Sequence, residues 1–147
     1  MKVYLDNCCY NRPYDDQSLL RISLETQAKL QIQRMIQEKR LELASSFVLE
    51  YENSRNPHLS RKEAISFFLQ ANVTTYINGE RIEEVREKAK EIQETGVKTA
   101  DALHTACSII SGCDYMITTD DRLLKYQTDE IKIVNPMEFI RLLEVEE

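Results

Sequence analysis

Short apolar runs alternate with longer stretches of helical periodicity along the whole chain. The predicted strands occupy residues 3–5, 41–44, 73–77, 115–118 and 131–134. Between them, apolar residues recur at three- and four-residue spacing, which predicts helices over 18–39, after Ser46, over 60–69, 80–95 and 99–111, and from Pro136 onward. Strands that alternate with helices pair in parallel and are covered on both faces. The fold class is therefore α/β, a three-layer α/β/α arrangement with a parallel sheet of about five short strands.

Capping and turn residues set the expected boundaries of these elements. Ser46 is suited to cap one helix, Ser60 and Glu63 have the spacing of a capping box, and Thr99 is suited to cap the helix that ends before Gly112. The polar stretch 7–16 contains a proline and is expected to be a loop.

Composition places the chain among ordinary globular proteins. Its 147 residues suit a single domain over 1–147, and 42% hydrophobic residues with only 3 Gly and 3 Pro exclude collagen-like and disordered classes. No long uncharged apolar stretch is present, so we expect no membrane span and a cytoplasmic location. The 4 cysteines lack metal-ligand spacing and are expected to be free thiols.

Acidic residues follow the predicted strands or begin the helices after them. These are Asp6, Glu50, Asp101 and Asp120. Sites in parallel α/β sheets form at the carboxyl ends of the strands, so these side chains are expected to meet there. Taken singly, Asp101 could serve only the helix dipole, and Asp6 and Asp120 could only begin turns.

Gathering several anions is costly, and proteins do so mainly to hold a metal ion. Oxygen ligands without a His or Cys cluster favour Mg²⁺ or Mn²⁺. Such ions support phosphodiester hydrolysis.

Four segments resemble the acidic motifs of PIN-domain nucleases. They are Tyr4–Asn7, Ala44–Glu50, Lys98–Ala106 and Ile117–Leu124, and Ala100–His104 is the strongest match. The resemblance implies a five-stranded parallel sheet and Mg²⁺- or Mn²⁺-dependent cleavage of single-stranded RNA. It also implies the role of toxin in a VapC-like toxin–antitoxin pair, with an antitoxin as partner and a homodimeric assembly.

The same resemblance assigns the catalytic and metal-binding acids to Asp6, Glu50, Asp101 and Asp120. Thr118 corresponds to a supporting threonine of the family. Asn7, and Cys8 after it, depart from the family's usual Thr or Ser followed by Asn or Ser. Asp121 competes with Asp120 for the role of fourth acid, and His104 is expected to be a structural residue or to touch the site.

The net charge of −6 excludes a uniformly basic nucleic-acid-binding surface, so phosphate contacts require local cations. The candidate RNA-binding residues near the acidic motifs are Arg12, Lys98, Arg122 and Lys125, and Tyr10 and Tyr14 could stack on bases. A catalytically silent PIN-like module that binds RNA or protein is the main alternative. A phospho-acceptor receiver is a third, but a second acid beside Asp6 and a Lys directly after residues 131–134 are both missing.

Overall fold

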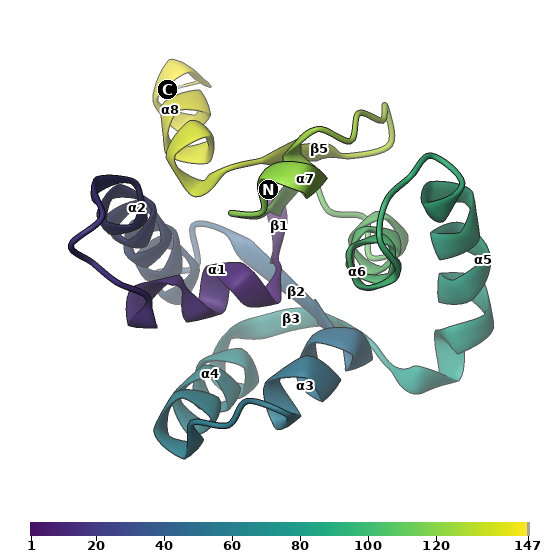
Figure 1. Cartoon of the computed structure of the whole chain (residues 1–147), viewed down its shortest axis with the longest axis horizontal. Coiled ribbons are helices and arrows are strands. Elements are labelled where there is room, and N and C mark those ends of the chain that lie inside the picture. Colours follow the sequence, from purple (N-terminus) through teal and green to yellow (C-terminus); the bar gives the residue numbers. More distant parts are fainter. Residues whose placement is uncertain (147) are drawn as a thin grey trace.

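A computed structural model describes residues 1–146 of the chain. Five parallel strands form one sheet in the order β3-β2-β1-β4-β5 (Figure 1). They are β1 (Lys2–Leu5), β2 (Glu42–Ser46), β3 (Val73–Ile77), β4 (Tyr115–Ile117) and β5 (Lys132–Val134). The predicted α/β class with a five-stranded parallel sheet is confirmed.

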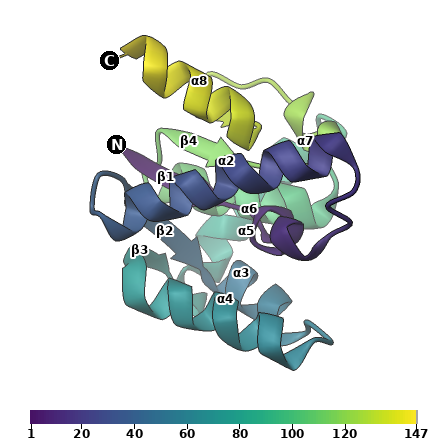
Figure 2. The same cartoon turned by 90° about the vertical axis from the view of Figure 1, so that its left-hand side faces the viewer.

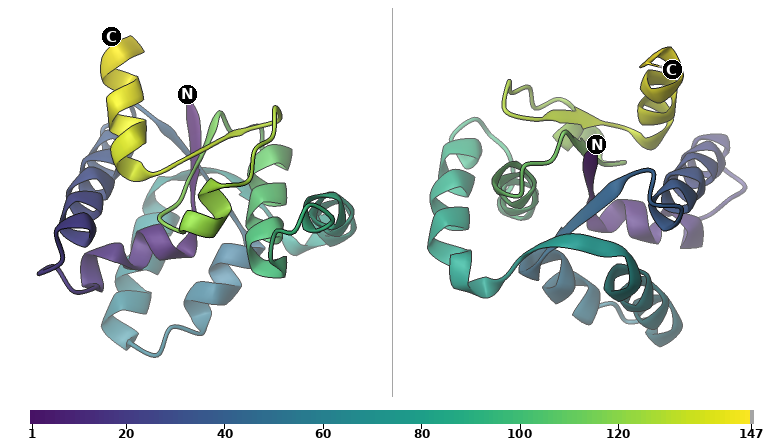
Figure 3. Two further views of the ribbon diagram at one scale, coloured as in Figure 1. Left: turned by 45° about the horizontal axis from the view of Figure 1, so that its top comes forward. Right: turned by 180° about the vertical axis from the view of Figure 1, so that it is seen from behind.

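Helices cover both faces of this sheet, as Figures 1 and 3 show. One face carries α1 (Asn7–Asn11), the 3-10 turn η1 (Arg12–Tyr14), α2 (Leu20–Gln37), α3 (Phe47–Ser54), α4 (Leu59–Asn72) and α8 (Pro136–Glu146). The other carries η2 (Gly79–Arg81), α5 (Ile82–Gln93), α6 (Thr99–Ile110) and α7 (Asp121–Leu124).

The two-residue periodicity of the strands divides the core between these faces. In β1, Val3 and Leu5 pack beneath α2 and α8, whereas Tyr4 points into the opposite layer with α5 and α6. In β4, Tyr115 and Ile117 pack on the same face as Val3 and Leu5, and Met116 packs on the same face as Tyr4. The central strands β1, β2 and β4 are almost entirely buried on both faces, which is why their sequences are mostly apolar, whereas the edge strands β3 and β5 are partly exposed.

Three local predictions differ from the structure. The stretch 7–16 is not a loop, because it contains α1 and η1. His58 rather than Ser60 precedes the first residue of α4, and Lys98 rather than Thr99 precedes α6. Ser46 does cap α3, because its Oγ accepts a hydrogen bond from the backbone N–H of Leu49.

All four cysteines are free, as predicted, with Cys8 half-buried and the others buried. Within residues 1–146, no helix combines the length and apolar character that crossing a bilayer requires.

Candidate active site

The site lies at the switch point of the sheet, between β1 and β4. The chain adds β2 and β3 on one side of β1 and then β4 and β5 on the other. Strands β1 and β4 pair in parallel, with Leu5 opposite Ile117, so both end at the same edge. Asp6 directly follows β1, and its backbone N–H donates to the carbonyl of Ile117 over 3.2 Å. Asp120 lies three residues beyond β4. Ligands of open parallel α/β sheets bind outside such a switch point.

Asp6 is held by three hydrogen bonds in a nearly buried position. The Thr118 hydroxyl donates to Oδ2 over 2.6 Å, the Cys8 thiol donates to Oδ1 over 2.8 Å, and the Cys9 N–H donates to Oδ1 over 3.2 Å. Burial, and then the neighbouring Cys8 sulfur, raise the pKa of Asp6 well above its usual range. The carboxyl group is thus fixed in direction, and its negative charge would be stabilised by a cation in front of it.

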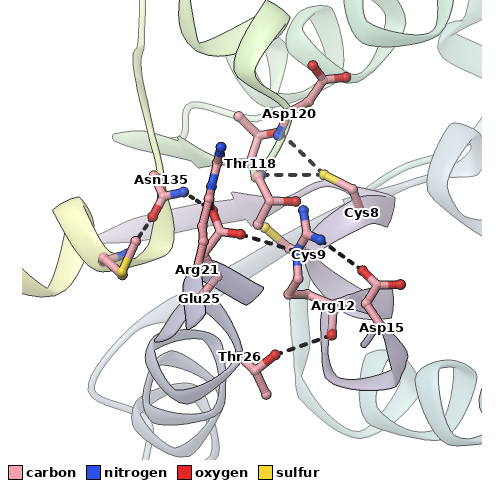
Figure 4. Close-up of polar contacts among 12 residues, drawn as sticks. Cys8, Cys9, Arg12, Asp15, Arg21, Glu25, Thr26, Thr118, Asp120 and Asn135 are labelled. Carbon is pink, nitrogen blue, oxygen red and sulfur yellow. Dashed lines mark hydrogen bonds and ion pairs between the residues drawn. The ribbon is translucent and has the colours of Figure 1, made fainter. Parts of the chain in front are cut away.

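Thr118 connects Asp6 to Asp120. Its Oγ1 donates to Asp6 and accepts a 3.0 Å bond from the backbone N–H of Asp120, and the side chain is fully buried. Figure 4 shows Thr118 and Cys8 side by side, with Asp120 beyond them. One hydroxyl therefore links the two acidic segments through hydrogen bonds.

Asp101 reaches the same region from the first turn of α6. It is half-buried, and burial first and the charge of Asp120 second raise the pKa of its carboxyl group. His104 and Lys98 act in the opposite direction. A carboxylate whose ionisation is disfavoured by burial and by a neighbouring anion would be stabilised in its charged form by a cation.

Glu52, on α3, is a further acid that lines the site. Its Oε1 lies 2.6 Å from His104 Nε2, and His104 Nδ1 lies 2.7 Å from the hydroxyl of Tyr4. The Tyr4 hydroxyl in turn lies 2.7 Å from Ser46 Oγ. Because a carboxylate only accepts, Nε2–H donates to Glu52, and the buried chain from Ser46 through Tyr4 and His104 holds this acid in place.

Glu50 does not belong to this site, contrary to prediction. It is exposed, and its carboxylate accepts a hydrogen bond from the hydroxyl of Tyr76 on β3. It lines a separate hollow with Gln70 and Tyr76. Residues two positions apart on a helix are rotated by about 200° about its axis, so Glu50 and Glu52 face nearly opposite directions.

Together these side chains surround a cleft of about 380 Å³, which we call the acid cleft. It is lined by Asp6, Asn7, Cys8, Asn11, Asp15, Glu52, Ala100, Asp101, His104 and Asp120. Three of the four predicted acids, Asp6, Asp101 and Asp120, converge here, and Asn7 also lies on the wall. His104, left open by the sequence, both touches the cleft and is 3% exposed with two hydrogen-bonding partners.

Asp121 is excluded from the acid cleft by an ion pair. Arg21 on α2 binds it through both terminal nitrogens, at 2.8 and 2.6 Å. The Arg21 guanidinium lowers the pKa of Asp121. Asp120 is therefore the acid presented to the cleft, and Asp121 is paired with α2 instead.

Arg12 lies outside both the acid cleft and the groove of the other predicted RNA-binding residues, and its guanidinium is paired with acids. Its guanidinium lies 3.0 Å from Asp15 Oδ2 and 3.4 Å from Oε1 of the fully buried Glu25. Figure 4 shows Arg12 and Arg21 at Glu25, together with Asn135, whose side-chain amide also donates to that carboxylate. Tyr10 is not available for base stacking because it is 1% exposed.

Three predicted RNA-binding residues line a second hollow, of about 540 Å³, which we call the basic groove. Its cations are Lys98, Arg122 and Lys125. Asp101 lines both the basic groove and the acid cleft, so the two are contiguous. Tyr126 and Gln127 also line the groove and were not anticipated.

The donor atoms of the acid cleft are spread over its walls. Within residues 1–146, the group of three potential ligands whose donor atoms all lie within 4.8 Å of one another is Asp6, Cys8 and Cys9. Cys9 is fully buried, and its thiol donates to the carbonyl of Ile117. Among the described residues, neither Asp101 nor Asp120 belongs to a group of three that meets this spacing. An ion held by them would keep several of its waters, as Mg²⁺ usually does.

Comparison of the sequence with protein-family models and with characterised proteins gave no significant match. The functional assignment therefore depends on the site itself.

Proposed function

We propose that the chain is a divalent-metal-dependent ribonuclease of the PIN-domain type, which hydrolyses phosphodiester bonds of single-stranded RNA. One observation carries this proposal: five acids line one cleft at the carboxyl edge of a parallel sheet, and they are Asp6, Asp15, Glu52, Asp101 and Asp120. Asp15 among them is paired with Arg12. A basic groove contiguous with that cleft supplies cations for a phosphodiester backbone.

The donor set fits a hard divalent ion. Burial raises the pKa of both Asp6 and Asp101, with a further contribution from the Cys8 sulfur at Asp6 and from the charge of Asp120 at Asp101. A bound cation would stabilise the negative charges of these carboxylates. Asp6, Asp101 and Asp120 would hold Mg²⁺ or Mn²⁺, with Glu52 on the opposite wall. When bound, the ion would activate water and stabilise negative charge on phosphoryl oxygens.

The protein's own side chains perform the positioning. Thr118 fixes Asp6 relative to Asp120, and His104 fixes Glu52. Lys98, Arg122 and Lys125 would contact the phosphates that flank the scissile bond, and these contacts set the position of the strand without reading its sequence. Tyr126, half-buried in the same groove, offers a ring for base stacking.

The toxin role, an antitoxin partner and a homodimer are proposals that rest on the resemblance. Exposed apolar side chains on α2 and α4 support an association through these helices. Leu20 is 74% exposed and Phe67 is 75% exposed.

Cleavage of an end-labelled single-stranded RNA tests the proposal. We expect products with Mn²⁺ or Mg²⁺, no products after chelation by EDTA, and no cleavage of the matching duplex. RNA that is bound but not cut with either metal would support the silent binding module instead. Cutting at the same rate in EDTA would refute a metal-dependent mechanism.

A further inference from the structure

A second site lies outside the acid cleft, around Lys29. It is a pocket of about 150 Å³ between η1, α2 and α4. Helices α2 and α4 lie on the same face of the sheet (Figure 2). Its walls are Tyr10, Pro13, Tyr14, Lys29, Leu30, Gln33, Ala64, Ile65 and Phe68. Apart from Lys29, Gln33 and the tyrosine hydroxyls, these side chains are apolar.

Lys29 is a buried amine without an anionic partner. It is 5% exposed, and its Nζ donates to Oε1 of Gln33 over 2.6 Å. The same nitrogen lies 5.4 Å from the ring centroid of Tyr10 and 6.0 Å from that of Phe68. None of the ion pairs among the described side chains includes Lys29.

These contacts compensate the charge only in part. An ammonium group has three N–H donors, and Gln33 accepts from one of them. Two ring faces add a weak attraction, but an unpaired buried cation loses far more on leaving water. Burial accordingly lowers the pKa of Lys29 to about 8.

The hydroxyl of Tyr10 is a second group without a partner in this pocket. Tyr10 is 1% exposed, and its hydroxyl makes no hydrogen bond within the described part of the chain. Buried hydroxyls are nearly always hydrogen-bonded, so a donor left unpaired beside a buried cation indicates a missing acceptor. One group could satisfy both: an anion with two acceptor oxygens.

We propose that this pocket binds a carboxylate on a short aliphatic stem. The carboxylate would pair with the Lys29 ammonium and accept a hydrogen bond from Tyr10, while the stem would lie against Tyr14, Leu30 and Phe68. A volume of about 150 Å³ has room for a few heavy atoms. One cation and apolar walls favour a monoanion over a phosphate group, which carries more charge and more acceptor oxygens.

The site is separate from the acid cleft and does not depend on the proposed nuclease activity. Helix α1 presents Asn7, Cys8 and Asn11 to the acid cleft, and Tyr10 to the carboxylate pocket. A free short-chain acid and the glutamate side chain of a polypeptide offer the same chemistry, so the test needs both.

The test is an NMR titration of the full-length protein, followed through backbone amides and the Lys29 side chain. The probes are butyrate, the neutral butyramide, and a short capped peptide with a central glutamate. We expect butyrate or the peptide to shift signals around the pocket, and butyramide to bind at least 10-fold more weakly. Binding of the peptide alone would identify a polypeptide as the source of the carboxylate.

Three variants decide the residue assignment. Lys29→Met should weaken binding at least 10-fold, Tyr10→Phe should weaken it several-fold, and Lys90→Met, at an exposed lysine on α5, should leave it unchanged. The Tyr10→Phe variant keeps the ring and stays informative if Lys29→Met fails to fold. No shifts at the pocket with either acid, equal binding of butyrate and butyramide, or full affinity in Tyr10→Phe would overturn the proposal.

Discussion

Replacing Glu52 by glutamine, with Glu50→Gln as the matched control, separates the site seen in the structure from the one expected from sequence. Glu52 lines the acid cleft 2.6 Å from a nearly buried His104, whereas Glu50 lies outside the cleft on the opposite side of α3. Both substitutions keep the size of the side chain and remove its charge. Only the first removes an anion from the cleft.

The size of the effect follows from the Glu52–His104 contact. A hydrogen bond to a charged group contributes about 1.5–3 kcal/mol, and a neutral one about 0.5–1.5 kcal/mol. The carboxamide oxygen of the variant can still accept from His104, so Glu52→Gln should cost about 1 kcal/mol, or roughly 3 °C in melting temperature for a chain of this size. Activity should fall by about 10- to 100-fold, because the variant changes a residue that lines the metal site.

The assay is RNA cleavage with Mn²⁺ alongside urea denaturation of the same samples. Glu50→Gln should cleave at the wild-type rate and change stability by no more than about 0.5 kcal/mol. Full activity in Glu52→Gln with a large loss in Glu50→Gln would refute the assignment of Glu52, rather than Glu50, to the site.

Three further outcomes follow from the site. The pKa of Asp101 is raised, so in metal-free buffer the folded protein holds the Asp101 proton more tightly than the unfolded chain does. The wild type should therefore lose stability relative to Asp101→Asn as the pH rises from about 4 through that raised pKa. A difference in unfolding free energy between the two proteins that stays constant with pH, measured by urea denaturation in EDTA, would contradict this. Asp120→Asn should lower RNA cleavage about 10- to 100-fold. Asp121→Asn should lose only an exposed ion pair worth about 0–1 kcal/mol and should cleave at the wild-type rate. The reverse pattern in paired assays would assign the acid of the fourth motif to Asp121. Alanine at Lys98, Arg122 or Lys125 should reduce the slope of log binding constant against log salt concentration for RNA by about 0.7 each. Fluorescence anisotropy should show no such change for Arg12→Ala. Equal slopes in all four variants would argue against the basic groove.

The fold was largely predictable because strands buried on both faces form apolar runs that alternate with helical stretches. Short elements were not predictable in this way. Helices α1 and α7 are shorter than two turns, so their sequences display no repeating helical pattern. They form because Asp6 and Asp120 accept hydrogen bonds from the backbone at their first turns.

The site was predictable only as far as the strand ends determine it. Asp6 and Asp120 follow paired strands, and their convergence follows from parallel topology alone. The choice between Glu50 and Glu52 depends on the rotation of α3 about its axis, which the cap at Ser46 and the burial of Val48 and Leu49 determine. That Arg12 is bound by Asp15 and Glu25 depends on the packing of α2, which no local pattern encodes.

The central claim is that the acid cleft holds a divalent ion. Mn²⁺ is paramagnetic and broadens NMR signals close to it, so a titration of the ¹⁵N-labelled protein locates the ion directly. We expect the amide signals of Asn7, Cys8, Asp101 and Asp120 to be lost first, and Asp101→Asn to weaken this effect. Broadening centred on exposed acids elsewhere, such as Glu83 and Glu84 on α5, or broadening that Asp101→Asn leaves unchanged, would contradict the claim.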